Sequence, residues 1–343
     1  MTRLSRPLFI TLIATLTLSI STERALAETM RPLYTANQNP LIQLNGLPPL
    51  EKGIVSAAGT SSSWTVLDIV SNSIAETRGE ESITLDGETY RLNFMFRHGL
   101  KQTVFGMRGV EVGIDIPYIR HSGGTLDGFI RNWHSALGLS NSERDQFREN
   151  QLRYEYSNNG TTLVRRVDST DRIGDIRLSA AWQLSCDRFR ERHCRALRAS
   201  LKLPTGRADK LSGSGGFNLS LAQTTTRTYQ RYTFHYGGGL QLNGASDLLN
   251  ERQKDVVGFA NASINYQTQR YRWMELKAQL DGHSAFYDSA LKNLGGNALQ
   301  INIGGTINFS KKMALDIAIT EDIITSAIPD VVFHLALRME HEQ

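Results

Sequence analysis

The chain has 343 residues, 38 basic and 34 acidic side chains, a formal net charge of +4 and 40% hydrophobic residues. This length accommodates one large β domain or two small domains. The basic residues are spread along the chain rather than clustered, so we expect no nucleic-acid partner.

The N-terminus has the layout of a secretory signal peptide. Arg3 and Arg6 precede an apolar run from residue 8 to residue 20, and Ala25-Leu26-Ala27 forms a small-x-small cleavage site. A retained membrane anchor is the alternative, but the run is too short for a helix that crosses a bilayer. The sequence therefore predicts removal of residues 1–27 on export.

Residues 28–61 show no regular period. We expect them to form a periplasmic N-terminal segment that folds back toward the interior of the following domain.

From residue 62 onward, apolar and polar residues alternate. In Thr89–Arg97, the residues Tyr90, Leu92, Phe94 and Phe96 form one set, and the others form a mainly polar set. A period of two places the two sets on opposite faces of a β-strand.

The same alternation predicts about twelve strands, most of them close to the length that crosses a bilayer at a tilt. The first is the least regular, because Leu67 and Ile69 fall on the face opposite Val66. The predicted ranges are 63–73, 88–98, 105–118, 173–184, 195–203, 216–224, 231–242, 256–267, 272–282, 298–309, 312–320 and 330–339.

The connections between these strands alternate in length. The short ones are 99–104, the turn between Cys186 and Cys194, 225–230, 268–271 and 310–311; the long ones are 74–87, 119–172, 204–215, 243–255, 283–297 and 321–329. Outer-membrane barrels have short periplasmic turns and long external loops. The sequence thus predicts an all-β fold, a transmembrane up-and-down antiparallel barrel over 62–343, in the outer membrane of a Gram-negative cell with both termini in the periplasm.

The second long connection is predicted to contain a helical insertion. Residues 121–150 break the strand period, and their apolar residues recur at helical spacing. Its apolar side chains, among them Phe129, Ile130 and Trp133, predict an external loop or a plug of the barrel. After it, Asn158-Asn159-Gly160 predicts the turn of a hairpin.

The same connection holds His121, Ser122, Asp127 and His134. A hydrolase needs a hydroxyl, a base and an orienting acid, and these residue types could supply them. No spacing fixes a triad, so a turn and a packing role are the simpler interpretation, and we expect no enzyme. We also expect no cofactor and no metal site.

Two cysteines, Cys186 and Cys194, lie in a polar stretch between two predicted strands. After export they would meet oxidising conditions, and this favours a local disulfide over metal binding.

The predicted inward face carries charges of both signs. A selective channel lined by charge and a closed lumen with mutually paired charges are both compatible with this set. The residues are Arg91, Arg97, Glu111, Asp115, Arg177, Arg198, Lys202, Glu275, Lys277, Asp281, Asp316 and Arg338.

Several short segments together resemble the proteobacterial outer-membrane family known as domain of unknown function 3187. They are Asn37-Gln38-Asn39-Pro40-Leu41, His121-Ser122-Gly123-Gly124, Leu126-Asp127-Gly128-Phe129-Ile130, Trp133-His134, Gln151-Leu152-Arg153-Tyr154, Gly174-Asp175-Ile176-Arg177-Leu178-Ser179 and Leu201-Lys202-Leu203-Pro204-Thr205-Gly206. The resemblance implies a β-barrel in the outer membrane. It does not indicate any activity.

The first hypothesis is therefore a porin-like or small-molecule transport barrel. The alternatives are a plugged structural or surface-interaction barrel and a hydrolase at the barrel rim acting on lipid or lipopolysaccharide. The expected partners are outer-membrane lipid, lipopolysaccharide and the barrel-assembly machinery.

Overall fold

The computed structural model describes residues 30–104, 106, 109–129, 132, 147–187, 193–322 and 327–341. Its strands are β1 (Ser61–Arg78), β2 (Glu81–Gly99), β3 (Val110–Ser122), β4 (Arg153–Asn158), β5 (Thr161–Arg166), β6 (Thr170–Ile173), β7 (Arg177–Asp187), β8 (His193–Lys202), β9 (Asn218–Tyr229), β10 (Tyr232–Asn243), β11 (Val256–Gln267), β12 (Met274–His283), β13 (Ala298–Asn308), β14 (Met313–Asp322) and β15 (Val331–His341). The helical turns are η1 (Gln43–Asn45), η3 (Ala208–Lys210), η4 (Asn250–Arg252) and α3 (Lys292–Gly295).

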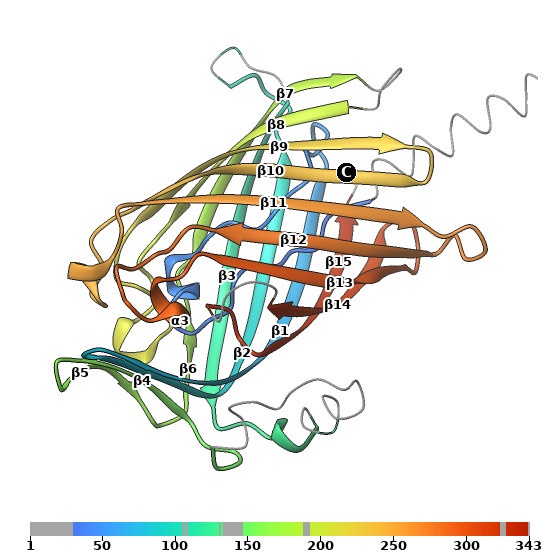
Figure 1. Cartoon of the computed structure of the whole chain (residues 1–343). Helices are drawn as coiled ribbons and strands as arrows, with labels where there is room; N and C mark the ends of the chain where they lie inside the picture. The colour runs from blue at the N-terminus through green and yellow to red at the C-terminus, as the bar shows by residue number, and fades with distance from the viewer. Residues whose placement is uncertain are drawn as a thin grey trace, which may run out of the picture.

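Twelve of these strands close into an antiparallel barrel. Each of β1 to β3 and β7 to β15 pairs with its neighbours along the chain, and β1 pairs with β15 to complete the ring (Figure 1). Closure satisfies the backbone groups that lipid cannot satisfy. The predicted fold class, an up-and-down barrel of about twelve strands, is confirmed.

The alternation places apolar side chains outside and polar side chains inside. On β2, Phe94 and Phe96 are 48% and 43% exposed, whereas Asn93 and Arg97 are both 2% exposed. An apolar outer band with a polar interior is the pattern of a membrane barrel. Among the residues that the structure describes, no helix is long and apolar enough to cross a membrane.

The connections differ at the two ends of the barrel. One end, the short-turn end, has hairpins such as the Gln230–Arg231 turn between β9 and β10. The other end, the long-loop end, carries β4, β5, β6, α3 and the remaining long connections (Figure 1).

The prediction of a long connection at 74–87 is wrong, because most of these residues belong to strands. Here β1 and β2 extend past the other strands to a turn at residues 79–80, and the extension of β2 pairs with β4. Charged residues near the turn suggest a loop in the sequence, but Ile74, Ile83 and Leu85 are buried beneath the β4–β5 hairpin. Burial of these side chains supports a strand where local composition favours a loop.

The predicted hairpin after the second connection is confirmed. β4 pairs with β5, and Asn159 and Gly160 form the turn with φ of 51° and 71°. Positive φ at both positions is what a two-residue hairpin turn requires.

The helical insertion predicted over 121–150 is not confirmed. Residues 121–122 belong to β3, residues 127–129 and 132 are helical, and most of the remaining insertion lies outside the described residues.

Candidate functional site

Residues 30–60, which we name the lumen segment, run inside the barrel (Figure 1, blue). They form a hairpin with a first limb (30–38), a turn (39–46) and a second limb (47–57). The first limb bonds to β12, where the Leu33 amide donates to Gln279 Oε1 at 2.9 Å. The second limb bonds to β9, where the Gly53 amide donates to Thr226 Oγ1 at 2.8 Å.

The turn is built by asparagine side chains and one glycine. Asn39 Oδ1 accepts the amide of Leu41 at 3.0 Å, and Gly46 adopts a left-handed φ of 62°. The carbonyl of Asn45 accepts hydrogen bonds from Asn218 on β9 and Gln241 on β10, at 2.7 and 2.9 Å. The chain therefore reverses direction in a fixed position inside the barrel.

An apolar cluster, which we name the apolar cap, covers the turn at the long-loop end. It joins the turn to β4, β5 and the loops around α3, and it buries large side chains completely. Burial of this much apolar surface stabilises the closed end by the hydrophobic effect. Its members include Leu41, Ile42, Leu44, Leu152, Tyr154, Tyr156, Val164, Phe286, Tyr287, Leu291, Leu294 and Ile328.

On one side of the lumen, the second limb joins a network of buried ion pairs. Arg97 Nη1 lies 2.6 Å from Asp115 Oδ1, and Arg97 Nη2 lies 3.0 Å from Glu51 Oε1. Arg198 Nη1 lies 3.0 Å both from Glu51 Oε2 and from Glu111 Oε1. One carboxylate of the lumen segment thus bridges two arginines of the wall.

Two more wall arginines lie next to this network. Arg177 Nε lies 3.1 Å from Asp115 Oδ2, and the Tyr34 hydroxyl donates to the same oxygen at 2.6 Å. Arg91 donates to Gln43 Oε1 at 3.4 Å and makes no ion pair with any residue described. We name Arg91, Arg97, Arg177 and Arg198, carried by β2, β7 and β8, the basic wall.

Burial and charge set the protonation of the second limb. Although burial alone would raise the pKa of Glu51, the positive charges of Arg198 and Arg97 lower that pKa to about 2. Burial lowers the pKa of the neighbouring Lys52 to about 7. Glu51 is therefore ionised at neutral pH and acts as the counter-ion of the two arginines.

The first limb faces a wall in which carboxylates outnumber cations. Arg31 Nη2 lies 2.9 Å from Glu340 Oε1 on β15, and Thr35 Oγ1 donates to Asp281 Oδ2 on β12 at 2.7 Å. We name the inward carboxylates of β1 and β12 to β15 the acidic wall; they are Asp68, Glu275, Asp281, Asp316 and Glu340.

The twelve charged residues predicted to line the lumen all lie on its inner face, and most are already paired. Lys277 Nζ lies 2.9 Å from Asp316 Oδ1, and Lys202 Nζ lies 2.5 Å from Asp175 Oδ2 at the long-loop end. The charges inside the barrel therefore pair mainly with one another and with the lumen segment.

The three candidate catalytic residues that the structure describes, His121, Ser122 and Asp127, do not form a triad. His121 is buried; its Nδ1 pairs with Thr89 Oγ1 and its Nε2 with the carbonyl of Leu211, both at 2.8 Å. These contacts use both ring nitrogens, and neither partner is Ser122 or Asp127. Asp127 accepts the amide of Asn150 at 2.9 Å. His134 lies outside the described residues.

The proposed plug residues of the second connection do not fill the lumen where the structure describes them. The ring of Phe129 lies 6.0 Å from that of Phe333, which faces outward on β15. Ile130 and Trp133 lie outside the described residues. At Phe129 this connection contacts the outer face of the barrel, while residues 30–60 run through the lumen; for the residues outside the described part, an external loop or a plug stays a prediction.

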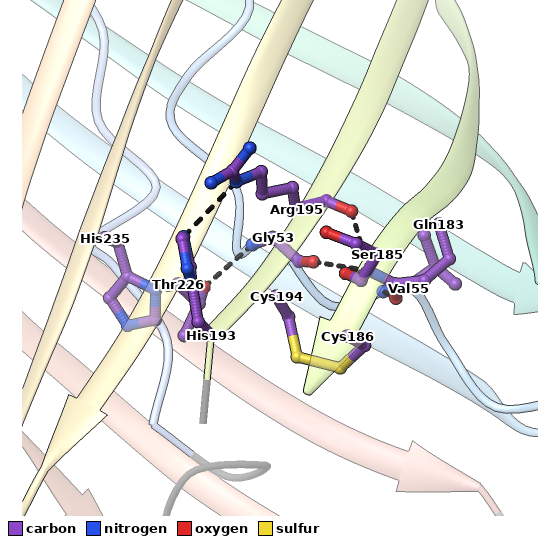
Figure 2. Close-up of a disulfide and its surroundings, with 10 residues drawn as sticks. All are labelled: Gly53, Val55, Gln183, Ser185, Cys186, His193, Cys194, Arg195, Thr226 and His235. Atoms are coloured by element: carbon purple, nitrogen blue, oxygen red, sulfur yellow. Dashed lines mark hydrogen bonds between the residues drawn. A yellow bond between two sulfur atoms is a disulfide. The ribbon is translucent and has the colours of Figure 1, made fainter. Parts of the chain in front are cut away.

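The predicted disulfide between Cys186 and Cys194 is present and lies beside the second limb (Figure 2). Gly53 passes so close to β8 and β9 that a Cβ atom there would lie 2.4 Å from the carbonyl oxygen of Cys194. The side chain of Gln183 donates to the Gly53 carbonyl at 2.8 Å and accepts the Val55 amide at 3.0 Å. The disulfide hairpin thus belongs to the surface that holds the segment.

Sequence reasoning missed the functional residues of the lumen segment, above all Tyr34 and Glu51. A usable signal was present in Asn37-Gln38-Asn39-Pro40-Leu41, because asparagine and proline there indicate a specific turn. A lone Glu51 in an aperiodic stretch gives no indication of its partners.

The fold defines a closed antiparallel β-barrel with an apolar outer band and a polar interior, the pattern of a membrane barrel. The profile of the family described as "Protein of unknown function (DUF3187)" matches residues 8–341, so the chain belongs to this family. No curated protein matches the chain.

The solved structures that match the chain include two bacterial proteins. The COG4313 outer membrane channel from Pseudomonas putida F1 has a TM-score of 0.53 and 12% identity, over 84% of this chain and 97% of that chain. The Ralstonia pickettii toluene transporter TbuX has a TM-score of 0.41 and 10% identity, over 93% of this chain and 97% of that chain. The first of these similarities supports a common barrel fold and no more.

Proposed function

We propose that this protein is an outer-membrane channel for small molecules, held closed by its own lumen segment. One observation carries the proposal: the limbs of the segment meet the walls mainly through hydrogen bonds and ion pairs, such as Arg97–Glu51 and Arg31–Glu340. When the segment leaves, water can form hydrogen bonds with the polar groups that it exposes. Exposure of an apolar core to water would instead cost free energy that no hydrogen bond recovers. The interior is therefore built as a polar conduit.

The geometry also supports an orientation of the barrel in the membrane, with the short-turn end toward the periplasm. The first described residues and the end of β15 meet at the short-turn end, where Arg31 pairs with Glu340. Short turns face the periplasm in outer-membrane barrels. The segment would then enter the lumen from the periplasm, and the apolar cap would seal the outer mouth.

The second candidate is a permanently plugged barrel with a surface role. The apolar cap favours it, because Leu41, Ile42 and Leu44 lock the turn in place at the long-loop end. The two candidates differ in whether the lumen becomes permeable when the segment is absent.

Solute entry into vesicles tests the proposal. Lipid vesicles would contain either the mature protein or a shortened chain without residues 28–57, and swelling would be followed in neutral sugars of increasing size. We expect slow swelling with the intact chain and rapid, size-limited swelling with the shortened chain. Cold and boiled gel migration would check that both barrels are folded. Folded but equally impermeable barrels would support the plugged structural alternative.

A further inference from the structure

The inner charges of the barrel are divided between opposite sides. In the ring of strands, β3, β7 and β8 lie across from β12, β13 and β14. The basic wall and its neighbours carry Arg91, Arg97, Arg177 and Arg198 against the carboxylates Glu111 and Asp115. Across the lumen, β12 to β14 carry the carboxylates Glu275, Asp281 and Asp316 against the single described cation Lys277, whereas Asp68 of the acidic wall lies on β1 beside Arg91.

One charged residue of each limb pairs with an oppositely charged residue of the wall. The limb on the basic wall brings the carboxylate of Glu51, and the limb on the acidic wall brings the guanidinium of Arg31. Without the segment, the four guanidinium groups of the basic wall would face three carboxylates: Glu111, Asp115 and, beside Arg91 on the neighbouring strand, Asp68. A planar guanidinium favours a carboxylate because the two can share parallel charge-assisted hydrogen bonds.

Arg177 provides an independent observation on the same wall. Its side chain is 8% exposed, and its Nη1 atom has no hydrogen-bond partner among the described residues. Arg177 also lines three adjoining pockets between the segment and the wall. A buried donor without a partner costs free energy, which an anionic acceptor would recover.

The pocket beside Glu51 is suited to the body of a small organic acid. Arg97, Arg177 and Arg198 line it together with the carboxylates of Glu51 and Asp115, so it has one more cation than anions while Glu51 is in place and two more when Glu51 leaves. The rest of the lining is partly polar, with Tyr34, Thr224 and Asn261, and partly apolar or small. The apolar or small residues include Pro48, Pro49, Leu50, Ala222, Gly237 and Phe259.

We propose that the basic wall is a binding site for the carboxylate of a small organic anion, and that Glu51 occupies this site in the closed state in place of the solute. This inference rests on the proposed function, since it names the solute class of the same lumen. A solute carboxylate would compete with Glu51 for Arg97 and Arg198, so arrival of the solute would favour release of the segment.

Chemical rescue tests the site without requiring transport. Glu51→Ala, made in the full mature chain, removes the resident carboxylate and leaves space for a small anion. Trypsin cleavage after Lys52, which is 7% exposed in the closed state, reports how firmly the second limb is held. Folding of each variant is checked by gel migration before and after boiling.

We expect cleavage after Lys52 in Glu51→Ala to be at least tenfold faster than in the unchanged chain. Sodium acetate should restore most of the protection, whereas acetamide and sodium chloride at the same concentration should not. Glu51→Gln fills the space without a charge, so acetate should not protect it. Adding Arg198→Gln to Glu51→Ala should abolish the rescue, and adding Arg120→Gln, which removes an exposed arginine, should leave it intact.

Equal protection by acetate, acetamide and chloride would overturn the proposal, as would rescue that survives Arg198→Gln. Cleavage of folded Glu51→Ala at the unchanged rate would overturn it as well, since Glu51 would then not hold the limb. Vesicle swelling separates the carboxylate site from the proposed channel. If acetate protects Glu51→Ala but the chain without residues 28–57 is impermeable, the carboxylate site is supported and the channel is refuted. If the shortened chain is permeable but acetate gives no protection, the channel is supported and the carboxylate site is refuted.

Discussion

The turn and the limbs of the lumen segment are held by different chemistry. The turn inserts Leu41, Ile42 and Leu44 into the apolar cap, whereas the limbs place Glu51 and Arg31 on walls of opposite charge. Apolar burial involves no titrating group, whereas the strength of an ion pair depends on the protonation of each partner. The turn is therefore held by apolar packing at one end of the barrel, and the limbs are held by polar contacts that respond to protonation.

The largest expected loss of stability follows from breaking the ion pairs that hold the second limb. Arg97→Gln would leave Asp115 and Glu51 buried without their shared partner, and we expect a loss of about 4 kcal/mol in the free energy of unfolding. Denaturant titration of the barrel, followed by gel migration, measures it. Arg120→Gln, at an exposed position, should change the value by less than about 0.5 kcal/mol. A similar small change for both variants would show that the ion pairs do not hold the limb.

The next largest loss of stability is expected from a substitution in the turn of the lumen segment. Leu41 is fully buried in the apolar cap, so Leu41→Ala should cost about 3 kcal/mol through lost burial and a residual cavity. Leu47→Ala, at a partly buried position beside the same cluster, is the matched control and should cost less. Both values come from the same denaturant titration. Equal costs for the two leucines would argue against a tightly packed cap.

A smaller effect is expected from the disulfide. Replacing both Cys186 and Cys194 with serine removes a crosslink that closes a short loop, and we expect a cost of about 2 kcal/mol. Because Gly53 and Gln183 hold the second limb beside this hairpin, trypsin cleavage after Lys52 should also become faster. Loss of stability without faster cleavage would show that the disulfide stabilises the β7–β8 hairpin but does not help to hold the second limb.

The smallest effect concerns pH. The pKa of Glu51 is lowered to about 2, so the stabilisation it gives is complete above its ordinary value of 4.5 and is lost as the pH falls toward 2. By pH 3.5 the loss should reach about 1 kcal/mol. The charged groups that act on Glu51 are Arg198, Arg97 and Arg31, and Glu111 on the wall also pairs with Arg198.

The pH effect is measured as the difference in segment release between the unchanged chain and Glu51→Gln at pH 7 and pH 3.5. The subtraction removes the titration of the wall carboxylates, which both chains share. The burial that lowers the pKa of Lys52 acts between pH about 7 and 10.5, outside this window. An identical pH response in the two chains would contradict the assignment to Glu51.

The barrel wall was predictable because each strand obeys a local rule. In Thr89–Arg97, alternation alone places Arg91 and Arg97 inside, and the structure has both there. The rule was weakest in β1, where Trp64 and Val66 face inward although they are apolar. They are buried by the lumen segment, since Tyr34 packs against their cluster and the Arg31 guanidinium lies 4.9 Å from the Trp64 ring.

The contents of the lumen were not predictable in the same way. The leucines of the turn follow no helix or strand period, because they fit a cap assembled from loops far away in sequence. The partners of Glu51, Arg97 and Arg198, lie on two different strands, and only the closed ring brings them together. The charges of the wall suggested internal pairing, but not that a segment before the first strand would contribute to it.

Single-channel recording in planar bilayers tests the central claim most directly, that residues 30–60 close the barrel. The mature chain and the chain without residues 28–57 would be compared after both are shown to be folded. We predict little steady conductance from the mature chain and a stable open channel from the shortened one. Equal conductance of the two folded chains would contradict the claim.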